Sequence, residues 1–142
     1  MAIDKDKLLK YLNDIEQQTA IIETALNTSN QDLLVDTLKI NGLKYAILTN
    51  AEAVGSCLQH ILAKKYFIAI TGYSEIIKKA GEKEIISPDL INRLVPFIHF
   101  RNMLVHHYWR VEDETFLENL RQGVNDFHKF REEIKEIIKK ER

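Results

Sequence analysis

Four side chains that can act on a phosphate group and move a proton lie within eight consecutive residues: Arg101, Asn102, His106 and Tyr108. The guanidinium of Arg101 stays positively charged and can donate two parallel hydrogen bonds to a phosphate. The imidazole of His106 has a reference pKa of about 6.5, so it can exchange protons near neutral pH. The amide of Asn102 can orient a phosphate oxygen or the imidazole. The set therefore suits chemistry on an anionic phosphate group.

The segment that carries these residues is predicted to be an amphipathic helix. Its start is the clearest in the chain, because Ser87 is a good N-cap, Pro88 suits the first helical position and Asp89 favours the positive end. Pro96 removes one backbone hydrogen bond inside the helix and should bend it. On a helical wheel, Arg101 falls on the same stripe as six apolar side chains. They are Leu94, Phe97, Ile98, Leu104, Val105 and Tyr108.

A guanidinium in an apolar stripe is costly unless a partner or a cleft receives it. Two interpretations of Arg101 remain open: it binds a phosphate in a functional cleft, or it forms a structural ion pair with an acidic side chain such as Glu52. Asn102 and His106 are four residues apart and share one flank of the stripe, and His99 lies close to that flank.

Other polar residues near the motif are candidates to line a cleft. They are His99 and His107 beside the motif, and Asn50 and Glu52 in an otherwise apolar helix face. His99, His106 and His107 could also bind a metal ion, but no carboxylate or cysteine completes a ligand set. We therefore expect neither a metal nor another cofactor.

Composition indicates an ordinary globular protein. The 142 residues suggest one domain over 1–142, with 45% hydrophobic and 29% charged residues. The net charge of −1 gives no overall basic excess, so a nucleic-acid site must be a local patch. The single cysteine, Cys57, excludes an internal disulfide and is expected in the core. Because no apolar run is long enough for a membrane span or resembles a secretory signal, we expect a cytoplasmic protein without membrane contact.

Hydrophobic periodicity predicts an all-α bundle of four long helices and one short helix. The expected helices are residues 4–27, residues 29–65, the short segment 73–80 ending at Gly81, the helix that starts at Ser87, and residues 114–139. Gly42 and Gly55 lie inside the second of these and indicate close approach of another helix. The buried face of that helix is predicted to include Leu34, Leu38, Tyr45–Ile47, Asn50, Val54, Cys57, Leu58 and Ile61.

The spacing of Arg101, His106 and Tyr108 resembles the R-x4-H-x-Y motif of the HepT toxins in the HEPN superfamily. Similarity extends to Gln59-His60-Ile61-Leu62, Tyr73-Ser74-Glu75, Phe100-Arg101-Asn102 and Val111-Glu112-Asp113, and so covers most of the chain. The sequence departs from the family at His99, where a small residue is more usual, and has His107 at the variable position.

The resemblance implies a metal-independent endoribonuclease toxin that leaves a 2′,3′-cyclic phosphate and a 5′-hydroxyl on RNA. In that case His106 is the general acid/base, Arg101 binds the phosphate and Asn102 orients the reacting groups. The resemblance also implies a homodimer in which two motifs face one cleft, and a nucleotidyltransferase antitoxin that attaches AMP to Tyr108. RNA is the expected substrate, and DNA is not expected to bind. An alternative from another class is a non-catalytic HEPN module that binds nucleotide or docks a nucleotidyltransferase.

Overall fold

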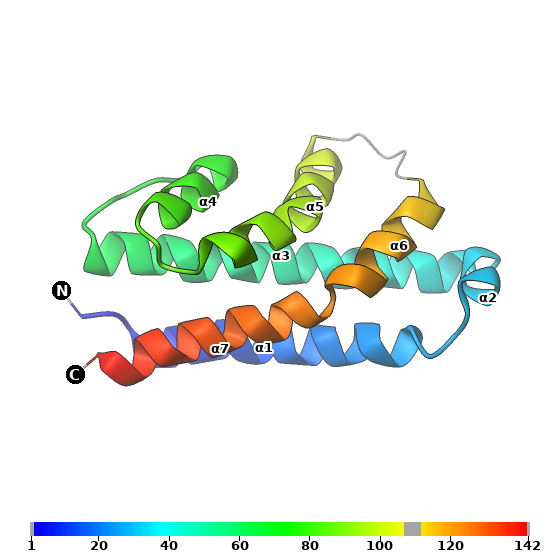
Figure 1. Cartoon of the computed structure of the whole chain (residues 1–142), viewed down its shortest axis with the longest axis horizontal. Coiled ribbons are helices and arrows are strands. Elements are labelled where there is room, and N and C mark those ends of the chain that lie inside the picture. Colours follow the sequence, from blue (N-terminus) through cyan, green and yellow to red (C-terminus); the bar gives the residue numbers. More distant parts are fainter. Residues whose placement is uncertain (1, 107–111, 142) are drawn as a thin grey trace.

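The computed structural model describes residues 2–106 and 112–141, which form helices and connecting segments (Figure 1). Within these ranges there are seven helices and no strand, so the predicted all-α class is confirmed. In chain order they are α1 (Lys5–Ala25), α2 (Asn30–Leu34), α3 (Thr37–Lys65), α4 (Tyr73–Glu82), α5 (Pro88–Val105), α6 (Asp113–Gly123) and α7 (Asn125–Lys140). No helix in the described part is long and apolar enough to cross a lipid bilayer.

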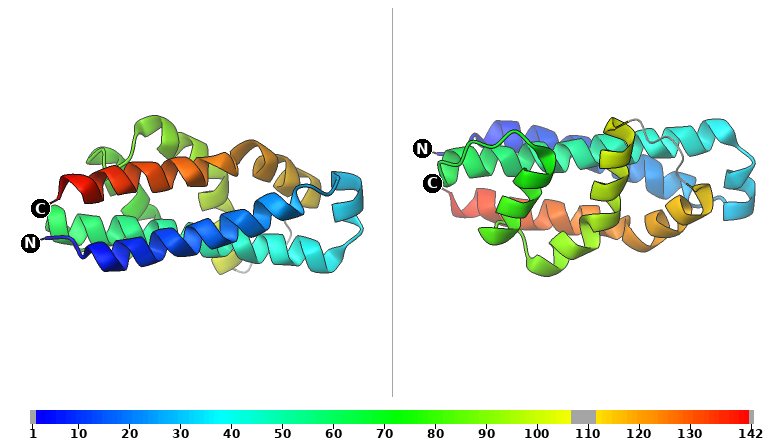
Figure 2. Two further views of the ribbon diagram at one scale, coloured as in Figure 1. Left: turned by 90° about the horizontal axis from the view of Figure 1, so that it is seen from below. Right: turned by 90° about the horizontal axis from the view of Figure 1, so that it is seen from above.

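The two long helices α1 and α3 run side by side and form the main pair of the bundle, and α7 lies along α1 (Figures 1 and 2). Asp4 caps α1 by accepting a 3.1 Å hydrogen bond from the amide of Lys7. The buried face of α1 is the predicted one, with Leu8, Leu12, Ile15, Thr19 and Ile22. Cys57 on α3 is fully buried as expected, and burial raises the pKa of its thiol to about 12.

Two of the predicted long helices are each divided in two. The segment 29–65 breaks after α2, because Asp36 accepts a 3.1 Å hydrogen bond from the amide of Lys39 and starts α3 as a new helix. The C-terminal segment divides between Gly123 and Asn125. A side chain at Gly123 would place its Cβ 2.8 Å from the ring of Phe97, so close packing of α5 requires glycine there. Among the described residues, the four predicted long helices are therefore present as α1, α3, α5 and α7, with three short helices in place of the one expected.

The first half of α3 buries the predicted face only in part: Ala46 and Ile47 are buried as predicted, whereas Leu38 and Tyr45 are not. Leu38 is 83% exposed and Tyr45 is 67% exposed. The buried positions are Ile40, Leu43, Ala46 and Ile47, which face α1 and the core. A Cβ at Gly42 would meet no described atom within 4 Å, so the close approach predicted there is wrong, whereas that predicted at Gly55 is confirmed.

Helix α5 begins as predicted and carries the motif away from the bundle axis. The hydroxyl of Ser87 caps the amide of Leu90 at 3.3 Å, and the Glu133 carboxylate on α7 accepts hydrogen bonds from the Ser87 amide and hydroxyl at 2.7 and 2.9 Å. The helix changes direction along its length around Pro96, and its second half crosses α3 (Figures 1 and 2). The predicted bend is confirmed.

The apolar stripe of α5 is shorter than predicted. Its buried side chains are Leu90, Leu94, Phe97 and Phe100. Toward the end of the helix Leu104 is half-buried and Val105 is 43% exposed, because little of the bundle reaches this far along α5. Tyr108, the last predicted member of the stripe, lies outside the described residues.

Candidate functional site

Arg101 is held by three groups from three helices. Its Nε atom donates to Oε1 of Glu52 at 2.7 Å, and its Nη1 atom donates to Oδ1 of Asn102 at 3.1 Å. The guanidinium carbon lies 4.1 Å from the centroid of the Tyr73 ring. Because the Arg101 side chain is only 17% exposed, these partners offset the cost of removing its charge from water. The ion pair with Glu52 that the sequence suggested is therefore present.

Tyr73 reaches Arg101 because Gly55 leaves room for its ring. A Cβ at position 55 would lie 2.6 Å from Cε1 of Tyr73, closer than side chains tolerate. The phenol hydroxyl donates a 2.7 Å hydrogen bond to the carbonyl of Ala51. Burial raises the pKa of Tyr73, so the phenol stays a neutral donor. Sequence reasoning missed this role of Tyr73; the only signal for it was a glycine inside a helix.

Asn102 contacts Arg101 through its side chain and His106 only through the backbone hydrogen bond of the helix. Its side-chain oxygen accepts from Arg101, its Nδ2 donates to the hydroxyl of Ser74 at 3.3 Å, and its backbone carbonyl accepts a 3.1 Å bond from the amide of His106. The helix ends at Val105, so His106 is the C-cap residue and not a member of a continuous helical flank as predicted. His106 is exposed, and its imidazole makes no hydrogen bond within the part of the chain that the structure describes.

A small opening lies beside the guanidinium, so Arg101 is not sealed inside the protein. The cavity measures about 100 Å³ and lies between α3, α4 and α5. It is lined by Glu52, Gly55, Ser56, Gln59, Thr71, Tyr73, Ile76 and Arg101. Glu52 is one of the residues at this opening, and its role in a functional cleft stays a prediction.

The other predicted cleft residues lie elsewhere. Asn50 is fully buried and donates a 3.1 Å hydrogen bond to the hydroxyl of Thr19, so its predicted place in a cleft is wrong. The position is polar because two buried polar side chains pair between α1 and α3. His99 lines a different cavity, on the α6 side of α5. His107 and Tyr108 lie outside the described residues.

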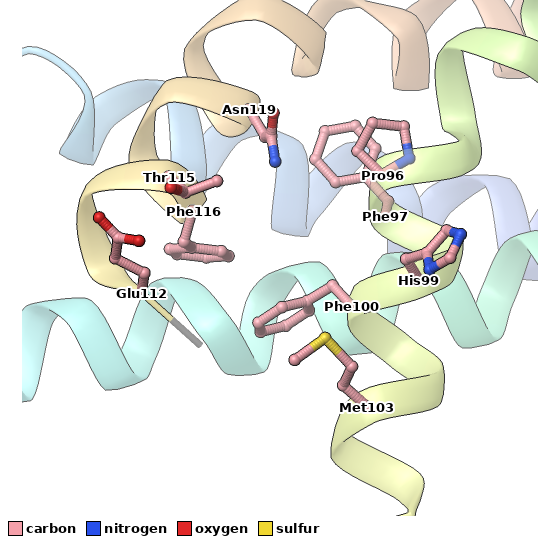
Figure 3. Close-up of a pocket in the computed structure, with 9 residues that line it drawn as sticks. All are labelled: Pro96, Phe97, His99, Phe100, Met103, Glu112, Thr115, Phe116 and Asn119. Carbon is pink, nitrogen blue, oxygen red and sulfur yellow. The ribbon is translucent and has the colours of Figure 1, made fainter. Parts of the chain in front are cut away.

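The cavity that contains His99 is the larger of the two, at about 280 Å³, and lies between α5 and α6 (Figure 3). Its lining residues are Pro96, Phe97, His99, Phe100, Met103, Glu112, Thr115, Phe116 and Asn119. The motif helix α5 thus has one cavity on the side of Arg101 and a second on the side of His99.

Two further histidines serve as structural links. Nε2 of His60 accepts a 2.9 Å hydrogen bond from the amide of Asp4, and so joins the end of α3 to the start of α1. His128 lies 3.1 Å from a carboxylate oxygen of Glu23. Among residues 2–106 and 112–141, no three histidine, cysteine or acidic side chains gather as a metal site would require.

The sequence profile of the HepT-like ribonucleases matches residues 15–134. The chain belongs to the HepT-like ribonuclease family. This match spans α1 to α7 and includes every described residue around Arg101. Among curated proteins, none matches the sequence.

Solved structures share the fold at low sequence identity. The tri-AMPylated HEPN toxin of Shewanella oneidensis, in complex with its MNT antitoxin, superposes with a TM-score of 0.83 at 17% identity, covering 93% of this chain and 98% of that one. A toxin–antitoxin complex with AMP-PNP gives a TM-score of 0.82 at 16% identity, over 92% and 98% of the two chains. The cytosolic protein YutE of Bacillus subtilis, of unknown function, gives 0.79 at 15% identity, over 97% and 93%. This HepT-like chain therefore has the HEPN fold.

Proposed function

We propose that this HepT-like protein is a metal-independent endoribonuclease and the toxin of a toxin–antitoxin pair. The observation that carries the proposal is the arrangement of Arg101, Asn102 and His106 at the end of α5. Arg101 lines an opening, His106 is exposed, and the Asn102 side chain accepts a hydrogen bond from Arg101. A fixed cation and a proton-exchanging imidazole are thus accessible at one helix end, as phosphodiester cleavage requires.

In the proposed reaction, the 2′-oxygen of one ribose forms a bond to the adjacent phosphorus. The bond from phosphorus to the 5′-oxygen of the next nucleotide breaks, which leaves a 2′,3′-cyclic phosphate and a 5′-hydroxyl. A base removes the 2′-hydroxyl proton, and an acid protonates the leaving 5′-oxygen. His106 exchanges protons in this step, and Arg101 stabilises the negative charge that develops on the phosphate. Asn102 keeps Arg101 in place.

The proposed active form is a homodimer in which two copies of the site face one groove. An exposed stripe of α3 supports this proposal. Leu38, Tyr45 and Glu52 are spaced seven residues apart and lie on one side of the helix. Leu38 and Tyr45 are highly exposed in the single chain, and Glu52 belongs to the Arg101 site. An apolar surface that continues into a candidate active site is a suitable contact for a second copy.

The proposed partner is a nucleotidyltransferase antitoxin that attaches AMP to Tyr108. The structural neighbours support it, because one is an AMPylated HEPN toxin bound to its MNT antitoxin. Added phosphate charge close to His106 in sequence would oppose an incoming RNA phosphate. Incubation with a cognate MNT-type nucleotidyltransferase and ATP should add the mass of AMP to the peptide that contains Tyr108. An unchanged peptide mass would contradict this part of the proposal.

The experiment that tests the proposed activity is an RNA cleavage assay in excess chelator. Purified protein should cut RNA under these conditions, and the products should carry 2′,3′-cyclic phosphate and 5′-hydroxyl ends. Products with 5′-phosphate ends would contradict the proposed chemistry. Intact RNA would instead support a non-catalytic HEPN module that docks a nucleotidyltransferase.

A further inference from the structure

The cavity between α5 and α6 combines aromatic surfaces with a polar rim (Figure 3). The rings of Phe100 and Phe116 lie 4.9 Å apart between centroids and are tilted by 30°, and Met103 lies beside them. These side chains come from both helices, so the cavity is built by the packing of α6 against the motif helix. Its apolar surface can contact the face of a flat ring.

The rim carries polar side chains that have no hydrogen-bond partner among the residues that the structure describes. His99, Thr115 and Asn119 line the cavity, and their side chains make no hydrogen bond within residues 2–106 and 112–141. In Figure 3 the Asn119 amide points into the space between Phe116 and Phe97. These groups can donate to or accept from the edge of a ligand. The lining has no lysine or arginine and includes the Glu112 carboxylate, so a neutral ligand fits better than a phosphate.

The cavity lies close to the proposed catalytic residues along α5. Phe100 directly precedes Arg101, and Met103 directly follows Asn102. His106 comes three residues after Met103, which is less than one turn of about 5.4 Å along the helix axis. A strand whose phosphate lies at His106 can therefore place a neighbouring base in the cavity.

We propose that this cavity binds one base of the RNA strand and sets the base preference of cleavage. The inference rests on the proposed ribonuclease function. Aromatic side chains stack bases, and polar side chains distinguish them by their hydrogen-bonding edges. The volume of about 280 Å³ lies just below the range of roughly 300–1,000 Å³ typical of drug-sized ligands, so one ring system fits and an oligonucleotide does not. Asn119 and His99 are the specificity residues.

Binding can be tested without any cleavage. The four nucleoside 3′-monophosphates are titrated into the full-length protein, with ribose 5-phosphate as a probe that lacks a base, and the backbone amide signals of Thr115 and Phe116 in the cavity are followed by NMR. One base should bind more tightly than the others by about tenfold, and Asn119→Ala should reduce that preference by roughly fivefold to tenfold. Equal binding of all four nucleotides and of ribose 5-phosphate would overturn the proposal.

A matched cleavage assay uses RNA oligonucleotides in which all 2′-hydroxyls but one are methylated, so that only one position can be cut. The bases on either side of that bond are varied in turn. His99→Ala and Asn119→Ala should flatten the base preference, whereas Glu118→Ala, an exposed change on α6 outside the cavity, should leave it intact. A preference unchanged in both cavity variants would overturn the proposal.

The two assays separate this inference from the proposed function. If the protein binds one base selectively but leaves RNA uncut, the ribonuclease function is contradicted and the base-binding cavity is supported. Cleavage without any base preference in the wild-type protein would keep the ribonuclease function and overturn the base site.

Discussion

The carboxylate of Glu52 lies 2.7 Å from Nε of Arg101, so the proposed phosphate-binding cation already has a counter-ion. Glu52 is 48% exposed, which means that its carboxylate can turn into solvent at little cost. Under the proposed function, an arriving RNA phosphate would compete with Glu52 for the guanidinium. The ion pair and the proposed phosphate-binding role of Arg101 would then be two states of one site.

Glu52→Gln should strengthen substrate binding. The amide oxygen of glutamine can still accept from Nε of Arg101, but the competing negative charge is gone. Removing one partly exposed charge is worth about 1 kcal/mol, so KM for RNA should fall by roughly fivefold with little change in kcat. Steady-state cleavage kinetics measure both constants. Glu75→Gln, an exposed change on α4, is the control for overall charge. A KM that stays constant or rises in Glu52→Gln would contradict the competition.

Gly55→Ala should damage the site through Tyr73. The new methyl group would lie 2.6 Å from Cε1 of Tyr73, so the ring must move away from Arg101. Overpacking of this kind costs about 1–3 kcal/mol, and we expect RNA cleavage to fall by about tenfold or more as Arg101 loses its support. Thermal unfolding and cleavage rates provide the two readouts.

The matched control for that variant is Gly81→Ala in α4. The nearest atom to its Cβ would be Cγ1 of Ile91 at 3.9 Å, an ordinary contact. Alanine inside a helix is favoured over glycine by up to about 1 kcal/mol, so Gly81→Ala should be neutral or stabilising and fully active. Equal effects of the two substitutions would show that Tyr73 does not position Arg101.

Sequence reasoning predicted the helix starts because capping is local chemistry. Asp4 and Ser87 accept hydrogen bonds from amides three residues later, and this pattern is visible in a few neighbouring letters. The break at Asp36 was not predicted, because the helical spacing of apolar residues continues on both sides of Asp36. The end of α5 at Val105 was also missed, since no glycine or proline marks it.

The contacts around Arg101 could be predicted only in part. Glu52 was identified because a charged residue in an apolar helix face needs a partner. Tyr73 was not identified, because Gly55 indicated a close approach in α3 but not which side chain of which helix would fill the space. The exposure of Tyr45 was missed for a related reason: periodicity shows that a helix has an apolar face and does not show which part of it the bundle covers.

Tyr45→Glu should separate the proposed dimer and reduce activity. The side chain is 67% exposed on α3, so glutamate is tolerated in the single chain but places a charge in an apolar contact with a second copy. Sedimentation should detect a shift from dimer to monomer, and RNA cleavage should fall with it. Ile21→Glu is the control, because Ile21 is 55% exposed on α1 and outside the α3 stripe. A Tyr45→Glu variant that remains dimeric would exclude this face as the contact.

Stability should fall in mild acid because of His60. Burial and the nearby Lys7 lower the pKa of His60 below its ordinary 6.5, and its neutral Nε2 accepts from the Asp4 amide. His60 binds a proton more readily in the unfolded chain than in the folded protein. The contribution of neutral His60 to the free energy of unfolding is therefore complete above pH 6.5 and is lost as the pH falls through the lowered pKa.

Urea unfolding between about pH 7 and about pH 5 measures this effect. His60→Gln keeps an acceptor for the Asp4 amide without a titrating group, so the free energy of unfolding should depend less on pH than in the wild-type protein. His99→Gln, an exposed position, should retain the wild-type dependence. An identical pH dependence in His60→Gln would contradict the assignment.

The most direct test of the central claim is the kcat/KM of RNA cleavage for Arg101→Ala and His106→Ala. Arg93→Ala and His128→Ala are the matched controls, since both are partly exposed and lie away from the Arg101 opening. We expect each site variant to lose about a hundredfold or more in kcat/KM while circular dichroism shows an intact helical fold, and each control to keep nearly full activity. Cleavage that persists undiminished in both folded site variants would contradict the account.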